Sequence, residues 1–228
     1  MIRWAFLDLG GTLLDDMAFH DEIYRVMMDA LATRGYSVSW ERFFEVRDLM
    51  ISQRVPVLRS MVHTFTNDKT ATASVIKELI ERISGRGAEL QTVLPEAHSI
   101  LENIKNDYKL GIVANQQTEI RKLLKESGLE RYFEVAVISE EIGISKPDVR
   151  IFLLALDIAG CEPPEAVMIG DRIDNDTAPA KRVGMKAIRI KAGIFRLQEP
   201  FSDREKPDVE ILMLAELPNA LKNLSKSD

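Results

Sequence analysis

The stretch IRWAFLDLGGTLLDD, from Ile2 to Asp16, begins with a short apolar run and continues into a loop that starts with Asp8 and contains two glycines. A run of this length, followed by such a loop, is typical of a strand buried in a parallel sheet. Similar runs return later, as KLGIVANQ at 109–116, VAVIS at 135–139, AVMIGD at 166–171 and KAIRI at 186–190, with a weaker one in DVEILML at 208–214. We therefore expect one sheet of several parallel strands.

Amphipathic stretches of helix length lie between the later runs, at 118–127, 148–159 and 176–183, and each is followed by glycine. Glycine directly after the last helical turn is a common C-terminal cap. Strands that alternate with helices form parallel sheets covered on both faces. The sequence therefore predicts an α/β fold built on a doubly wound parallel sheet.

Residues 16–91 break this alternation, because they contain no convincing strand. They read as amphipathic helices near 20–34, 40–52, 57–65 and 71–84, separated by glycine, proline and polar residues. We expect a core domain made of residues 1–15 and 92–228, and a helical cap domain made of residues 16–91.

The composition excludes several classes of protein. The chain has 228 residues, 46% of them apolar, which is enough to bury a sizeable core. Its formal net charge of −6 argues against nucleic acid as a partner. The single cysteine, Cys161, cannot form an intrachain disulfide, and no apolar run is long enough to span a membrane. We expect a cytoplasmic protein without a membrane partner; its oligomeric state is not indicated.

Polar residues follow the predicted strands at the ends where ligands bind in doubly wound sheets. Asp8 follows the first strand, Asn115 the second, Lys146 lies after the third, and Asp171 and Asp176 come after the fourth. Carboxylates that converge repel one another unless a cation lies between them, and oxygen ligands without His or Cys suit Mg²⁺. A metal held there would in turn bind a phosphate.

Four segments resemble, in order and spacing, the four motifs of the haloacid dehalogenase superfamily: DLGGTLLD at 8–15, IVAN at 112–115, SKPDVRIF at 145–152 and GDRIDNDTAPAKRVGM at 170–185. The inserted helices resemble the cap of that superfamily. The resemblance implies that Asp8 is a nucleophile that takes a phosphoryl group, and that Lys146 steadies the charge of both. It further implies a Mg²⁺ site formed by Asp8, the carbonyl of Gly10 and Asp171.

The same resemblance gives supporting roles to the remaining motif residues. Asp176 would hydrogen-bond to the residues around the metal, and Thr12 and Asp15 would fix the turn after the nucleophile. Ala114 and Asn115 would lie beside the bound substrate, although Asn115 could equally cap the helix that follows.

Two positions depart from the phosphatase pattern. Phosphatases of the superfamily carry a second aspartate two residues after the nucleophile, as general acid and base, and this chain has Gly10 there. The second motif normally ends in Thr or Ser, and this chain has Ala114. Metal binding should survive both changes, whereas turnover should suffer, since general acid–base help is worth about 10²- to 10⁴-fold.

The function that follows is a Mg²⁺-dependent phosphohydrolase for a small phosphorylated metabolite, either with weak general catalysis or with a substitute acid supplied by the cap or by the substrate. The alternatives are a ligand-binding or regulatory protein that has lost turnover, and a dehalogenase or phosphonatase-like enzyme. Arg47 and Arg54 are seven positions apart and would reach an anionic substrate together if their helix continues that far. His20, His63 and His98 have no partner at metal spacing and are expected to be surface or packing residues.

Overall fold

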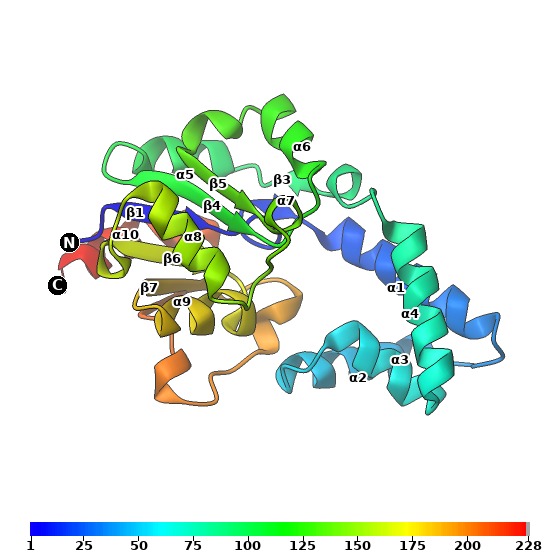
Figure 1. The fold of residues 1–228 in the computed structure, drawn as a ribbon. Helices are drawn as coiled ribbons and strands as arrows, with labels where there is room; N and C mark the ends of the chain where they lie inside the picture. Colours follow the sequence, from blue (N-terminus) through cyan, green and yellow to red (C-terminus); the bar gives the residue numbers. More distant parts are fainter. Residues whose placement is uncertain (227–228) are drawn as a thin grey trace.

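A computed structural model of the chain describes residues 1–226 and contains a six-stranded sheet (Figure 1). All neighbouring strands in it are parallel, in the order β5-β4-β1-β6-β7-β8. The strands are β1 (Trp4–Leu7), β4 (Lys109–Ala114), β5 (Val135–Ile138), β6 (Ala166–Gly170), β7 (Lys186–Ile190) and β8 (Val209–Ile211). The predicted fold class is confirmed, including the weakly indicated last strand.

Helices cover both faces of the sheet because successive side chains of each buried strand point to opposite sides. Ala5 and Leu7 of β1 belong to the apolar cluster on one face, and Trp4 and Phe6 belong to the cluster on the other. The first face is covered by α5 (Ala97–Ile104), α6 (Ile120–Glu126) and α10 (Leu217–Lys226), and the second by α8 (Arg150–Ala159) and α9 (Ala178–Arg182). A further short helix, α7 (Ser139–Ile142), follows β5.

Four helices form a bundle apart from the sheet: α1 (Met17–Ala32), α2 (Trp40–Ser52), α3 (Val57–Thr66) and α4 (Lys69–Ile83). They have an apolar cluster of their own, which includes Met27, Phe43 and Leu79. The side chain of Ser39 caps α2 by accepting a hydrogen bond from the Arg42 amide at 3.2 Å. The four predicted helices are therefore present, with ends within three residues of the expected ones.

A short antiparallel pair lies where the chain passes between sheet and bundle. It joins β2 (Leu14–Asp15) to β3 (Thr92–Val93), so the two crossing segments run side by side. Figure 1 places the bundle on the side of the sheet opposite the two chain ends, beyond the carboxyl ends of the strands. In the described part of the chain, no helix combines the length and apolar character needed to cross a membrane.

Candidate active site

Asp8 lies directly after β1, in the centre of the sheet, with strands on both sides. Its backbone amide donates to the Ile169 carbonyl at 2.9 Å, which continues the pairing of β1 with β6. Its Oδ1 accepts hydrogen bonds from the Leu9 amide at 2.8 Å and from Lys146 Nζ at 2.9 Å. Within residues 1–226, Oδ2 has no hydrogen-bond donor, so this oxygen can react with or bind another group.

Lys146 lies between two carboxylates and has a fully buried side chain. Its ammonium contacts Asp176 Oδ1 at 2.6 Å as well as Asp8. Burial alone would lower the pKa of Lys146, but the charges of Asp176 and Asp8 outweigh burial and raise that pKa above its usual value. Lys146 therefore remains a cation, as a residue that balances negative charge must.

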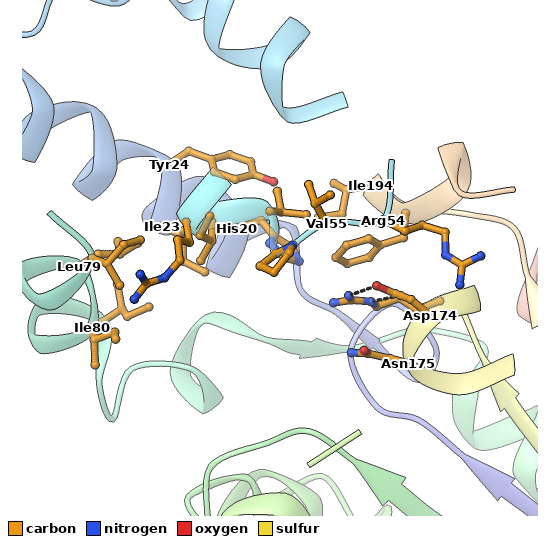
Figure 2. Close-up of a pocket in the computed structure, with 18 of the residues that line it drawn as sticks. His20, Ile23, Tyr24, Arg54, Val55, Leu79, Ile80, Asp174, Asn175 and Ile194 are labelled. Atoms are coloured by element: carbon orange, nitrogen blue, oxygen red, sulfur yellow. Dashed lines mark hydrogen bonds and ion pairs between the residues drawn. The ribbon is translucent and has the colours of Figure 1, made fainter. Parts of the chain in front are cut away.

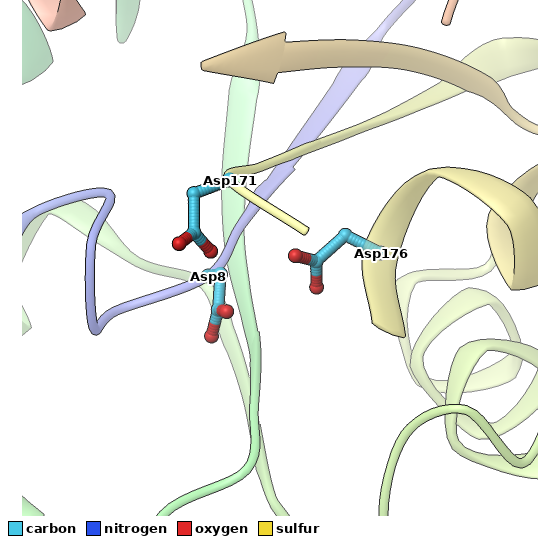
Figure 3. Close-up of side chains that lie close together, drawn as sticks. All are labelled: Asp8, Asp171 and Asp176. Atoms are coloured by element: carbon cyan, nitrogen blue, oxygen red, sulfur yellow. The ribbon is translucent and has the colours of Figure 1, made fainter. Parts of the chain in front are cut away.

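Three carboxylates converge beyond the strand ends: those of Asp8, Asp171 and Asp176, which face a common space in Figure 3. One oxygen of each lies within 4.8 Å of the others, a spacing at which they could hold a metal ion. Burial, reinforced by Asp176 and Asp8, raises the pKa of Asp171 well above its usual value. Burial also raises the pKa of Asp176 to about 6, although Lys146 opposes this.

The donor set fits Mg²⁺. One ammonium balances only one of the three carboxylates, and no donor within residues 1–226 hydrogen-bonds to the buried Asp171 carboxylate. Asp176, by contrast, has its oxygens engaged by Lys146 and by the Arg172 amide at 3.1 Å. A hard cation with oxygen ligands would stabilise Asp171 in its charged form. Asp8 and Asp171 are thus the carboxylates best placed to hold it.

The loop after Asp8 contributes a close approach that depends on glycine. Gly11 has φ +66°, and a Cβ there would lie 2.6 Å from Asp171 Oδ2. Only glycine combines this left-handed conformation with room for the carboxylate. Gly10, whose carbonyl is the predicted third metal ligand, lies in the same loop and is bridged to Leu14.

The other predicted site residues have different surroundings. Asn115 clamps the backbone of Lys146: its Oδ1 accepts from the Lys146 amide and its Nδ2 donates to the Lys146 carbonyl, both at 2.8 Å. Ala114 is fully buried, with its methyl group in the apolar cluster beneath α5, α6 and α10. Thr12 is buried with an unpartnered hydroxyl among the described residues, and Asp15 Oδ1 accepts from the Met17 amide at 2.9 Å.

A cavity of about 610 Å³ lies between the helical bundle and the loops after the strands (Figure 2). Its bundle side is mainly apolar, with Ile23, Leu79 and Ile80 among the lining residues. Its sheet side includes Pro147 and Arg172, which directly follow Lys146 and Asp171 in the chain. The cavity therefore lies beside the loops that carry Lys146 and Asp171, and its size is typical of small-molecule sites.

The expectation that Arg47 and Arg54 act from one helix face is wrong. Helix α2 ends at Ser52, and Arg54 follows it with φ 54°, so the two side chains diverge. Arg47 pairs with Asp48 at 2.6 Å, and Arg54 Nη1 binds Glu205 of the core at 2.7 Å. The sequence already predicted that this helix ends near residue 52, so the continuation on which the shared face depended does not occur.

His20 has more contacts with the site than the sequence suggested. It lines the cavity, and its Nε2 lies 3.4 Å from Asp16 Oδ2, a pair at helical i, i+4 spacing. That spacing was visible in the sequence, but nothing in it indicated that the Asp16 carboxylate turns back toward Gly10.

Comparison with known proteins places these features in one family. Residues 6–190 match the model of the haloacid dehalogenase-like hydrolases. A glyceraldehyde 3-phosphate phosphatase of Pyrococcus furiosus is 33% identical over 236 residues, covering 100% of this chain and 95% of that protein.

Solved structures agree with the sequence comparison. A HAD phosphatase from Thermococcus onnurineus is 28% identical with a TM-score of 0.62, covering 97% of this chain and 98% of that one. A 2-haloacid dehalogenase from Pseudomonas syringae pv. Tomato is also 28% identical, with a TM-score of 0.63 over 98% of this chain and 100% of that one. The parallel sheet, the convergent carboxylates and these matches together assign the chain to the haloacid dehalogenase-like hydrolase family.

Proposed function

We propose that the chain is a Mg²⁺-dependent phosphohydrolase that removes the phosphoryl group from a small phosphorylated metabolite through a covalent intermediate on Asp8. The observation that carries the proposal is the contact of Asp8 with the buried Lys146 at 2.9 Å, beside the Asp171 carboxylate, next to loops that line a cavity. The name of the Pyrococcus furiosus relative and the description of the Thermococcus onnurineus structure support a phosphatase.

The free oxygen of Asp8 is the proposed nucleophile. Asp8 Oδ1 is held by Leu9 and Lys146, which leaves Oδ2 to attack phosphorus while the ester oxygen leaves. Attack gives an aspartyl-phosphate, and attack of water on its phosphorus then releases phosphate and frees Asp8. Holding the carboxylate in place before reaction lowers the entropic cost of reaching the transition state.

The other residues of the cluster balance the negative charge of Asp8 and of the phosphoryl group. Lys146 offsets the negative charge that gathers between Asp8 and the phosphoryl group, and Asn115 fixes the backbone from which Lys146 extends. Mg²⁺, held by Asp8, Asp171 and the Gly10 carbonyl, would supply further positive charge for the phosphoryl oxygens. Asp176 keeps Lys146 and the Arg172 amide in place.

The departures at positions 10 and 114 bear on the rate. Gly10 offers no proton to the leaving oxygen, and Ala114 offers no hydroxyl to the phosphoryl group. Thr12 and Asp15 remain the proposed residues of the turn, and Ala114 and Asn115 the proposed neighbours of the substrate. We also propose that residues 16–91 act as the cap domain over a core of residues 1–15 and 92–228, because the cavity lies between these two parts.

The test is a screen of phosphorylated metabolites with and without Mg²⁺, run beside Asp8→Asn. We expect phosphate release that requires Mg²⁺ and falls by at least about 10²-fold in the variant, because an amide is a poor nucleophile. Residual activity above about a tenth of wild type would place the reaction elsewhere.

A second function has one observation in its favour, the likeness to a solved 2-haloacid dehalogenase. Chloride release from a 2-chloroacid, measured on the same preparation, distinguishes it. Halide release without metal, together with an absence of phosphate release, would replace the phosphatase proposal.

A further inference from the structure

The side chain of Asp16 unexpectedly lies beside Gly10. The position has no left-handed φ, so its backbone does not itself require glycine. A Cβ built there would lie 2.7 Å from Asp16 Oδ2 and 3.6 Å from Asp16 Cγ. The carboxylate of Asp16 thus fills the space that a side chain at position 10 would enter. Position 10 is two residues after Asp8 in the chain.

This placement is not explained by helix capping. Asp16 is the N-cap residue of α1, where an aspartate usually accepts a hydrogen bond from an amide of the first turn. The Asp16 side chain accepts no such bond, whereas the preceding Asp15 accepts one from the Met17 amide. The Asp16 carboxylate is 22% exposed and turns toward the loop of Asp8 instead.

Asp16 is connected to the cavity through His20. Its Oδ2 lies 3.4 Å from Nε2 of His20, and His20 lines the cavity between the helical bundle and the loops after the strands. The Asp16 carboxyl group thus lies against the nucleophile loop at Gly10 and one contact away from the space available to the organic part of a substrate.

Hydrolysis of an ordinary phosphate ester needs such a group. An alkoxide is a poor leaving group unless it is protonated as the bond to phosphorus breaks. Lys146 is already engaged by Asp8 and Asp176, and Gly10 has no side chain.

We propose that Asp16 provides the proton that position 10 cannot, an inference that rests on the proposed phosphatase function. The Asp16 carboxyl gives its proton to the ester oxygen as the bond between that oxygen and phosphorus breaks and the Asp8–phosphorus bond forms. The Asp16 carboxylate then takes a proton from water as the water oxygen bonds to phosphorus and the Asp8–phosphorus bond breaks. Alcohol and phosphate are the products, one water is consumed, and Asp16 regains its proton.

Asp16→Asn tests this role through the leaving group. The variant and wild type are compared on an alkyl phosphate, whose leaving oxygen needs a proton, and on acetyl phosphate, whose leaving carboxylate does not. We expect kcat/KM, which reports the attack by Asp8 and not the later hydrolysis, to fall by about 10²- to 10⁴-fold on the alkyl phosphate and to change less than about threefold on acetyl phosphate. Asp21→Asn, an exposed position on the same helix, is the control and should change neither.

An equal loss of kcat/KM on both substrates, or no loss on either, would overturn the role of Asp16 as the acid. If the wild-type protein releases phosphate and Asp16→Asn has the same activity, the role of Asp16 is contradicted but the phosphatase proposal is not. If the wild-type protein cleaves neither substrate, this would contradict the phosphatase proposal and, with it, the role of Asp16.

Moving the carboxylate gives a second test that survives a folding defect in Asp16→Asn. Gly10→Asp alone should be poorly active, because its Cβ meets the Asp16 carboxylate. Gly10→Asp combined with Asp16→Gly removes that contact and should regain at least about tenfold in alkyl phosphate turnover over Asp16→Gly. Failure to regain activity in a double variant with an unchanged melting temperature would contradict the proposal.

Discussion

At the scale of single residues, the site depends on a glycine, Gly11, that lets two carboxylates lie close together. Gly11 brings the loop of Asp8 against Asp171, since a Cβ there would lie 2.6 Å from the carboxylate. The approach keeps Asp8 and Asp171 close enough to share a cation. The sequence shows the glycine pair but not which carboxylate it accommodates.

Replacing Gly11 by alanine should therefore damage the metal site as well as the fold. Gly35→Ala is a matched control, because Gly35 also has a left-handed φ, of +82°, but a Cβ there would meet nothing within 4 Å. Both variants should lose about 1–2 kcal/mol of stability through backbone strain. Only Gly11→Ala should also weaken Mg²⁺ binding in calorimetry, and equal Mg²⁺ affinity in both variants would contradict the close approach.

Asp171 itself should determine the affinity for Mg²⁺. Asp171→Asn is expected to weaken Mg²⁺ binding by at least about tenfold in calorimetry without substrate, because it removes a ligand charge. Asp107→Asn, at an exposed position before β4, should bind Mg²⁺ as wild type does. Unchanged affinity in Asp171→Asn would place the metal elsewhere.

The sequence could predict that Asp8, Lys146, Asp171 and Asp176 meet, because each follows a parallel strand and such ends share one edge of the sheet. It could not predict the position of Asp16, eight residues after Asp8, because this depends on the path of the loop and of β2. The clamp of Asn115 on the Lys146 backbone was equally hidden, since both partners lie in irregular segments.

At the scale of elements, the strands from β1 to β7 in the six-stranded sheet were predicted well because each is a short, mostly buried apolar run, whereas β8, with its exposed Glu210, was indicated only weakly. The two-residue strands β2 and β3 were missed, since so short a pairing leaves no periodic pattern. Helix α10 was also missed, although its apolar residues recur at helical spacing: Leu217, Ala220, Leu221 and Leu224. The proline at its second position is compatible with a first helical turn.

The segment after α2 ties the bundle to the core. Arg54 makes two contacts with Glu205, at 2.7 and 3.2 Å, and its guanidinium lies 4.3 Å from the centre of the Phe201 ring. Both side chains of the ion pair are largely buried, so losing one leaves the other without its partner.

Arg54→Met should lower the melting temperature by about 5 °C or more, since breaking a buried pair costs about 3–5 kcal/mol. It should also raise KM, because Arg54 lines the cavity. Arg42→Met removes an exposed pair with Glu45 in the same helix region and should change neither quantity measurably. A melting temperature within 1 °C of wild type, roughly the effect of a surface pair, would show that the contact does not hold the two parts together.

At the scale of the whole molecule, bundle and sheet form the cavity jointly. The bundle gives an apolar wall that includes Ile23, Leu79 and Ile80, whereas the sheet side brings Asp174 and Asn175 (Figure 2). A phosphate ester bound with its phosphorus at Asp8 would direct its organic part toward that wall. The resemblance of the motifs could predict a small phosphorylated substrate, but the apolar character of the wall appears only when distant helices are brought together.

A homologous series of straight-chain alkyl phosphates tests this arrangement. We expect kcat/KM to rise by roughly two- to fourfold for each added methylene until the cavity is filled, from the free energy of burying a CH₂ group. Analogues with a terminal hydroxyl and the same chain length should lose the gain. A flat or falling series would contradict an apolar substrate pocket at this place.

The stereochemical course at phosphorus tests covalent catalysis by Asp8 most directly. A phosphorothioate ester made chiral at phosphorus by oxygen isotopes is hydrolysed in isotopically labelled water, and the configuration of the product is determined. Two successive in-line displacements, the first by Asp8 and the second by water, predict retention of configuration. Inversion would mean that water attacks the substrate directly, and would contradict an aspartyl-phosphate on Asp8.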